Sequence, residues 1–229
     1  MRVSLGILLA SIVMLASCGE QLVHNKGARI LAMGDSMMAW HSSTRRSIPD
    51  QLEVALQEPV VNRAVSGARV IYGLPISGAL GMRIASQYVP GDWDWVVVNG
   101  GGNDLWLGCG CVFCNGRMNR MIAPDGQSGK IVDMVTNLSD RGTRVIYIGY
   151  PRSPGLGSLI EHCKDDGDEL ERRLALMADA RRGVHFLSLR DLVPHGDRTY
   201  HSFDMIHPSL KASKAIGEAV ARIIRSEAG

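Results

Sequence analysis

Two short motifs at opposite ends of this chain contain the residue types of an activated serine nucleophile. Gly34-Asp35-Ser36 lies near the N-terminus, and Asp204-Met205-Ile206-His207 lies near the C-terminus. A serine hydroxyl is a weak nucleophile unless a base removes its proton, and a histidine held by an aspartate is suited to that task. We therefore predict that Ser36 is the nucleophile, that His207 is its base, and that Asp204 orients His207.

Two further motifs between them supply hydrogen-bond donors. Ser66-Gly67 stands in one, and Gly101-Gly102-Asn103-Asp104 forms the other. Negative charge that builds on a substrate oxygen needs preorganised donors, and a glycine N–H can approach closely because no Cβ blocks it. We predict an oxyanion hole formed by the backbone N–H groups of Ser36 and Gly67 and the side-chain amide of Asn103. Asp104 is expected to be structural.

The elements that must position these motifs alternate between short apolar runs and periodic amphipathic segments. Short apolar runs indicate buried parallel strands, and periodic segments indicate helices. Sites in parallel sheets lie at the carboxyl ends of strands, and the first three motifs each follow a predicted strand. The predicted strands are residues 30–33, 60–65, 93–99, 144–150 and 184–189; the predicted helices are residues 47–57, 128–140, 168–182 and 209–226, with loop and helix mixed over 72–88.

This order of elements predicts an α/β fold, a three-layer α/β/α sandwich with a five-stranded parallel sheet. The length of 229 residues suits one domain. The hydrophobic share of 45% and charged share of 21% are typical of globular proteins and exclude a disordered or coiled-coil chain. With 25 basic and 23 acidic residues, the net charge of +2 is too balanced for a nucleic-acid binder, so no nucleic-acid partner is expected.

The four motifs, in this order, resemble those of the SGNH (GDSL-type) hydrolase family. The resemblance covers residues 29–225. It implies a flavodoxin-like fold and a serine esterase or acylhydrolase that cleaves carboxylic esters through an acyl-enzyme, with Ser36, Asp204 and His207 as catalytic residues. It also implies no cofactor, no metal, and a small-molecule, glycan or lipid ester as substrate. The cysteines from Cys109 to Cys114 depart from the family pattern.

The N-terminal residues predict export and lipid attachment. Arg2 precedes an apolar run over residues 5–16, which is too short for a bilayer span of about 20 residues but suits a signal peptide. Small residues lead directly to Cys18, which resembles the lipobox of bacterial lipoproteins. We predict a signal peptide at 1–17, a lipidated N-terminus and tether at 18–28, and a hydrolase domain at 29–229, anchored by lipid to a bacterial membrane in the cell envelope or periplasm. A plain secretory signal is the alternative.

Four more cysteines remain in the predicted mature chain. An exported protein meets an oxidising compartment, so two disulfides are the favoured use. Four cysteines allow three pairings, and the sequence does not choose among them. The rival is a zinc site, because three of the four cysteines form a dense cluster of potential ligands. The disulfide candidates are Cys109, Cys111, Cys114 and Cys163.

Several alternatives stay open from the sequence. An O-acyltransferase would use the same acyl-enzyme, and a non-catalytic envelope binding protein would keep only the fold.

Trp40 and Trp106 follow the first and third motifs and are candidates for lining an acyl or sugar pocket or for packing. No G-x-S-x-G motif occurs, which disfavours the α/β-hydrolase family. The oligomeric state is open. Other candidate bases, none of which has an acid three residues before it, are His41, His195 and His201.

Overall fold

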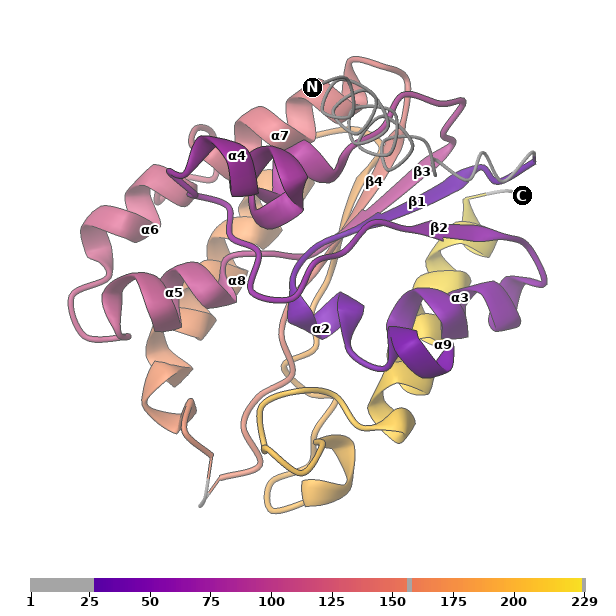
Figure 1. Cartoon of the computed structure of the whole chain (residues 1–229). Coiled ribbons are helices and arrows are strands. Elements are labelled where there is room, and N and C mark those ends of the chain that lie inside the picture. The colour runs from indigo at the N-terminus through magenta and orange to yellow at the C-terminus, as the bar shows by residue number, and fades with distance from the viewer. Residues whose placement is uncertain (1–26, 156–157, 228–229) are drawn as a thin grey trace, which may run out of the picture.

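A five-stranded parallel sheet forms the centre of the molecule (Figure 1). The computed structural model describes residues 27–155 and 158–227. The strand order is β2-β1-β3-β4-β5, and every neighbouring pair is parallel, which confirms the predicted fold class. The strands are β1 (Ile30–Met33), β2 (Val60–Asn62), β3 (Trp95–Val98), β4 (Arg144–Ile148) and β5 (Val184–Leu187).

Helices cover both faces of this sheet and complete three layers (Figure 1). One face is covered by α3 and α9, which pack against each other, and the other by α5 to α8. The helices are α2 (Ser36–Ala39), α3 (Ile48–Leu56), α4 (Pro75–Ser77), α5 (Gly102–Cys109), α6 (Asn115–Met121), α7 (Lys130–Ser139), α8 (Lys164–Asp179) and α9 (Leu210–Ser226), with the shorter turns η1 (Ser42–Thr44), η2 (Gly78–Met82), η3 (Ile84–Gln87), η4 (Glu161–Cys163) and η5 (Arg198–Tyr200).

Strands β1 and β3 are apolar throughout because both faces of the sheet are buried there. Successive strand residues point to opposite faces. In β1, Ile30 and Ala32 pack into the core under α3 and α9, whereas Leu31 and Met33 pack into the core under α5 to α8. All four side chains are fully buried. A strand with two buried faces cannot show polar alternation, which explains the continuous apolar runs in the sequence.

Some elements differ from the prediction in extent. The second strand ends at Asn62, earlier than predicted, where the Asn62 side-chain oxygen accepts a hydrogen bond from the Ala64 N–H at 3.0 Å and turns the chain. Helix α8 begins at Lys164 rather than at Asp168, with two acidic residues in its first turn, where the helix dipole favours them. Helices α5 and α6 were not predicted.

The predicted signal peptide at 1–17, the lipidation site Cys18 and most of the tether lie outside the described residues. None of the helices in residues 27–155 and 158–227 has the length and apolarity that crossing a membrane requires.

Candidate active site

Ser36 lies just after the carboxyl end of strand β1, as the first residue of α2. Gly34 turns the chain with a positive φ of 151°. A Cβ at this position would overlap the side-chain oxygen of Asn99, so the turn requires glycine. Asp35 then caps α2, because its carboxylate accepts the Met37 N–H at 2.9 Å. This arrangement leaves Ser36 partly exposed at the edge of the sheet.

A continuous hydrogen-bonded chain joins the three predicted catalytic residues. The Ser36 Oγ lies 2.8 Å from His207 Nε2, although the two residues are 171 positions apart. On the other side of the imidazole, His207 Nδ1 lies 2.5 Å from Asp204 Oδ2. In this arrangement the Nδ1–H donates to Asp204, and the unprotonated Nε2 is left to accept the serine proton. The geometry suits proton transfer from Ser36 to His207.

Backbone hydrogen bonds hold Asp204 in its place. Its second oxygen accepts the N–H groups of Ile206 and His207, both at 3.0 Å. Partial burial by itself raises the pKa of the Asp204 carboxyl, but hydrogen bonds from the His207 ring and from these two N–H groups outweigh burial and leave the pKa below its usual value. Asp204 therefore stays ionised and keeps the imidazole oriented.

Trp40 stacks on the imidazole of His207. The ring centroids of Trp40 and His207 are 3.9 Å apart, and the ring planes differ by 6°. Trp40 follows Ser36 by one helical turn, and its N–H donates to the Ser36 carbonyl at 2.8 Å. Residues four apart on a helix share a face, so the same turn presents both the Ser36 hydroxyl and the stacked ring to His207.

The predicted oxyanion donors Gly67 and Asn103 are connected through Ala68. The Asn103 amide donates to the Ala68 carbonyl at 3.1 Å, and Gly67 precedes Ala68 in a turn with a φ of +80°. An amide nitrogen carries two hydrogens, and this bond uses one of them. Asn103 lines the same cavity as Ser36, whereas Gly67 is not among the residues that line it.

A cavity of about 320 Å³ opens beside Ser36 and His207. This volume lies at the small end of ligand sites, which range over roughly 300–1,000 Å³. Of the two tryptophans that the sequence singled out, Trp106 lines the cavity. The apolar residues around it come from α5, from the segment after β4, from α8 and from the loop before α9, and include Leu105, Trp106, Pro151, Ile160, Leu170, Val193 and Ile206.

A buried network beneath Ser36 has no counterpart among the sequence predictions. Tyr150 donates from its hydroxyl to Asp35 at 2.5 Å and accepts the Gly102 N–H at 3.0 Å, and Asn99 also donates to Asp35. Burial raises the pKa of the Asp35 carboxyl despite these hydrogen bonds, and burial together with nearby Asp35 raises the pKa of Tyr150 well above its usual value. The strand-end rule applied to β4 would have identified Tyr150, which directly follows Gly149.

The other candidate histidines occupy different surroundings. His41 places its Nε2 3.1 Å from the carbonyl oxygen of Pro208. His195 is exposed and lines the cavity. His201 is buried, which lowers its pKa although Asp204 opposes that effect. Among the described residues, His207 is the histidine that contacts the Ser36 hydroxyl.

Asp104 has the structural role that its position suggested. Its carboxylate is fully buried and accepts the N–H groups of Val70 and Ile71 at 2.7 and 2.9 Å. Arg117 pairs with it at 3.1 Å. Burial raises the pKa of Asp104 even though these partners act in the opposite direction. Asp104 thus connects α5 to a distant loop rather than acting on a substrate.

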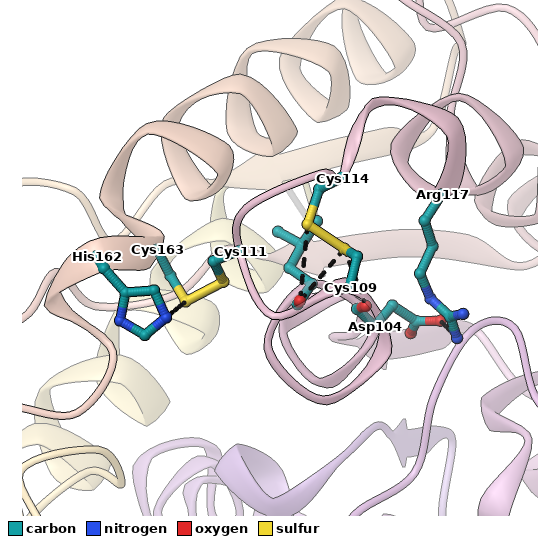
Figure 2. Close-up of a disulfide and its surroundings, with 8 residues drawn as sticks. Asp104, Cys109, Cys111, Cys114, Arg117, His162 and Cys163 are labelled. Atoms are coloured by element: carbon teal, nitrogen blue, oxygen red, sulfur yellow. Dashed lines mark hydrogen bonds and ion pairs between the residues drawn. A yellow bond between two sulfur atoms is a disulfide. The ribbon is translucent and has the colours of Figure 1, made fainter.

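The four cysteines form two disulfides, Cys109–Cys114 and Cys111–Cys163 (Figure 2). His162 lies beside the second, with its Nε2 3.8 Å from the Cys163 Sγ. Zinc binds deprotonated thiols, and sulfurs paired in this way are not available as such ligands. The second disulfide joins the loop between α5 and α6 to the turn that begins α8.

Comparisons with known proteins identify the family of the chain. Residues 32–215 match the GDSL-like Lipase/Acylhydrolase family. A search of curated proteins found no significant match. Among solved structures, a GDSL-like lipase from Bacteroides thetaiotaomicron is 17% identical, with 96% of this chain and 98% of that chain covered and a TM-score of 0.58.

Two solved structures of carbohydrate acetylesterases from Sinorhizobium meliloti are also similar. One is 16% identical, with 86% of this chain and 97% of that chain covered and a TM-score of 0.57. The other is 19% identical, with 86% of this chain and 98% of that chain covered and a TM-score of 0.53. At these identities the likeness shows the fold, whereas the family match covers most of the sequence. The chain therefore belongs to the GDSL-like lipase/acylhydrolase family and is an ester-bond hydrolase.

Proposed function

We propose that this protein is a serine esterase in which Ser36, His207 and Asp204 form the catalytic triad. The observation that carries the proposal is the hydrogen-bonded chain from the Ser36 hydroxyl through His207 to Asp204, with distances of 2.8 and 2.5 Å, at the edge of a cavity. The ionised state of Asp204 supports its role in stabilising the imidazolium that forms during the reaction.

The proposed reaction has two halves. The Ser36 Oγ attacks the ester carbonyl carbon while its proton passes to His207 Nε2. The tetrahedral intermediate then expels the alcohol, which takes that proton, and the acyl group stays on Ser36. Water attacks the acyl-enzyme, gives its proton to His207, and releases the carboxylic acid as the proton returns to Ser36.

Hydrogen-bond donors would stabilise the oxygen that becomes negative in each half. The proposed donors are the N–H groups of Ser36 and Gly67 and the Asn103 amide. The bond from Asn103 to the Ala68 carbonyl supports this proposal, because it fixes the amide and the turn after Gly67 relative to each other. Loss of one such donor typically lowers kcat by about 10²–10³-fold.

A fluorophosphonate probe tests the nucleophile. We expect Ser36→Ala to abolish both labelling and hydrolysis of p-nitrophenyl esters. The matched control is Ser42→Ala, an exposed serine in the turn after α2, which should keep both. His207→Ala should lower kcat by roughly 10³-fold or more. Normal labelling of the Ser36→Ala protein would overturn the assignment.

The comparisons also support a proposal about the substrate class. The similar structures are named as a lipase and as carbohydrate acetylesterases, so a small-molecule, glycan or lipid ester is proposed. The same acyl-enzyme could pass its acyl group to an alcohol instead of water. Product analysis with added alcohol acceptors separates hydrolysis from transfer.

We also propose that residues 1–17 direct export and that Cys18 carries the lipid that holds the protein to a bacterial envelope membrane. The charged start, the short apolar run and the small residues before Cys18 support this. Two disulfides also fit an oxidising compartment. Mass spectrometry of the mature protein should find an acylated Cys18, and Cys18→Ala should release the protein from membranes. An unmodified mature N-terminus at another residue would contradict the proposal.

A further inference from the structure

The cavity beside Ser36 has an apolar interior and a polar mouth. Its apolar lining residues that keep part of their surface accessible include Trp106, Ile160, Val193 and Ile206. The charged or polar side chains that are exposed around it are Glu161, Lys164 and His195.

Arg152 also lines the cavity, but two carboxylates neutralise it. Its guanidinium lies 2.6 Å from Asp168 and 3.1 Å from Glu171. The interior therefore offers apolar surface to a ligand, with polar groups placed where the ligand meets solvent.

One wall of this cavity depends on the Cys111–Cys163 disulfide. Cys163 lines the cavity, as do neighbouring residues of η4 and the first turns of α8. None of the η4 side chains is buried. Hydrogen bonds within residues 158–163 are mostly local, and the longer-range bond joins the Ser158 hydroxyl to the Met205 carbonyl at 2.9 Å. The disulfide therefore provides the principal tether of this wall to the loop after α5, across 52 residues of sequence.

We propose that this cavity binds an aliphatic acyl group longer than acetyl, and that the Cys111–Cys163 disulfide determines how well it does so. The inference rests on the proposed function, because it takes Ser36 as the site of attack. An acetyl group would leave most of the apolar interior without contacts, whereas a longer chain would remove that surface from water. Each buried methylene should then raise kcat/KM by about fourfold until the cavity is full.

Gly167 provides a way to shorten the cavity without disturbing the fold. It lines the cavity within α8, and a Cβ added to it meets no atom within 4 Å. The backbone there accepts a side chain, and leucine favours a helix more than glycine does. Gly116 offers the matched control, since it lies in α6, is exposed, and also has no atom within 4 Å of an added Cβ.

The first experiment measures kcat/KM for p-nitrophenyl esters from acetate to dodecanoate. In the wild-type protein we expect a rise with chain length up to a medium chain. Gly167→Leu should lower the value for octanoate by about tenfold or more and leave acetate within about threefold. Gly116→Leu should match the wild type. A wild-type preference for acetate, or equal losses for acetate and octanoate in Gly167→Leu, would overturn the assignment of the cavity.

The second experiment removes one disulfide at a time. Cys111→Ser/Cys163→Ser should reduce the gain per methylene to less than about twofold, while Cys109→Ser/Cys114→Ser should keep the full gain. Circular dichroism would establish that each variant is folded. If the first is not, the Cys109→Ser/Cys114→Ser protein is reduced, and the thiols of Cys111 and Cys163 are alkylated with a bis-bromide, which forms a longer thioether bridge and releases two bromide ions. An unchanged gain per methylene would overturn the role of the disulfide.

Binding without turnover separates this inference from the proposed function. Calorimetry with the Ser36→Ala protein should show tighter binding of methyl octanoate than of methyl acetate, and Gly167→Leu in that background should remove the difference. If octanoate esters bind as weakly as acetate, the acyl-binding inference fails while Ser36 can still be the nucleophile. If Ser36→Ala still hydrolyses esters, the proposed nucleophile is wrong whatever the chain-length preference.

Discussion

Trp40 gives His207 a contact that the four sequence motifs do not specify. The two rings are parallel and 3.9 Å apart, so the face of the indole lies against the imidazole. An aromatic face attracts a cation, and in the proposed reaction His207 becomes a cation when it takes the proton of Ser36. The stacked ring therefore stabilises the protonated imidazole of the transition state more than the neutral imidazole of the resting enzyme.

Replacing Trp40 should slow the reaction. A cation–aromatic contact contributes about 0.5–2 kcal/mol, so Trp40→Leu should lower kcat by about 2–30-fold. Trp40→Phe should lose less, because it keeps a smaller aromatic face. Site-specific fluorinated tryptophans at residue 40 weaken the attraction with little change in shape, so kcat should fall as fluorine atoms are added. Equal kcat across the fluorinated series would show that the ring acts by shape alone.

The burial of Asp35 makes the free energy of unfolding depend on pH. Its carboxyl is buried, and burial raises its pKa above the ordinary value of 3.8. The folded protein then binds this proton more tightly than the unfolded chain does. The contribution of Asp35 to the free energy of unfolding is therefore largest at low pH and is lost as pH rises through its folded-state pKa.

An uncharged replacement removes this pH dependence. As pH rises from about 4 to about 8, the wild type should lose free energy of unfolding through Asp35, whereas the Asp35→Asn variant should not. The free energy of unfolding of the variant minus that of the wild type should therefore increase with pH. Urea denaturation at several pH values measures it. We expect kcat to fall in the same variant, because Asp35 caps the helix that carries Ser36 and holds Tyr150. A difference that decreases with pH would mean that burial does not dominate the pKa of Asp35.

At the scale of elements, the sheet was easier to predict than the helices near the site. The buried strands are short apolar runs, and their ends placed Ser36 and Asn103 at one edge. Helices α5 and α6 lack such a signal. Helix α5 begins after Gly101, which has a φ of +107°, and contains Gly108 in its last turn. Glycine disfavours helix, so the local helix propensity of this segment is low and no helix was predicted there.

Tertiary contacts stabilise these two helices instead. Leu105 of α5 and Met118 and Met121 of α6 are buried in one core, and the Asp104–Arg117 pair joins the two helices. Such contacts depend on how distant segments pack, which a local sequence pattern does not contain. For the same reason the sequence identified Ser36, Asp204 and His207 as candidates but missed the stacking of Trp40 on the imidazole and the bond from Tyr150 to Asp35.

At the scale of the whole molecule, the two disulfides connect the site to the fold in different ways. The sequence left three pairings open, because the choice depends on where the loop after α5 meets the start of α8. The pairing Cys109–Cys114 closes a short local loop, and Cys111–Cys163 joins two elements on the same side of the sheet. Of the two, the second holds together parts of the chain that separate widely on unfolding.

This difference predicts unequal losses of stability. In the chain-entropy model, a cross-link stabilises the folded state more when it closes a longer loop in the unfolded chain. The sequence separations are 5 residues for Cys109–Cys114 and 52 for Cys111–Cys163. Serine pairs should therefore lower the free energy of unfolding by about 2 kcal/mol for the first and about 4 kcal/mol for the second.

Urea denaturation of the two double variants beside the wild type measures both losses. Single Cys→Ser variants are unsuitable, because each leaves a reactive thiol that can exchange with the other disulfide. If the Cys109–Cys114 pair proves the more stabilising, local strain or residual structure in the unfolded chain outweighs loop length. If the order is as expected, the disulfide that we propose to shape the acyl-binding cavity is also the one on which the stability of the folded state depends more.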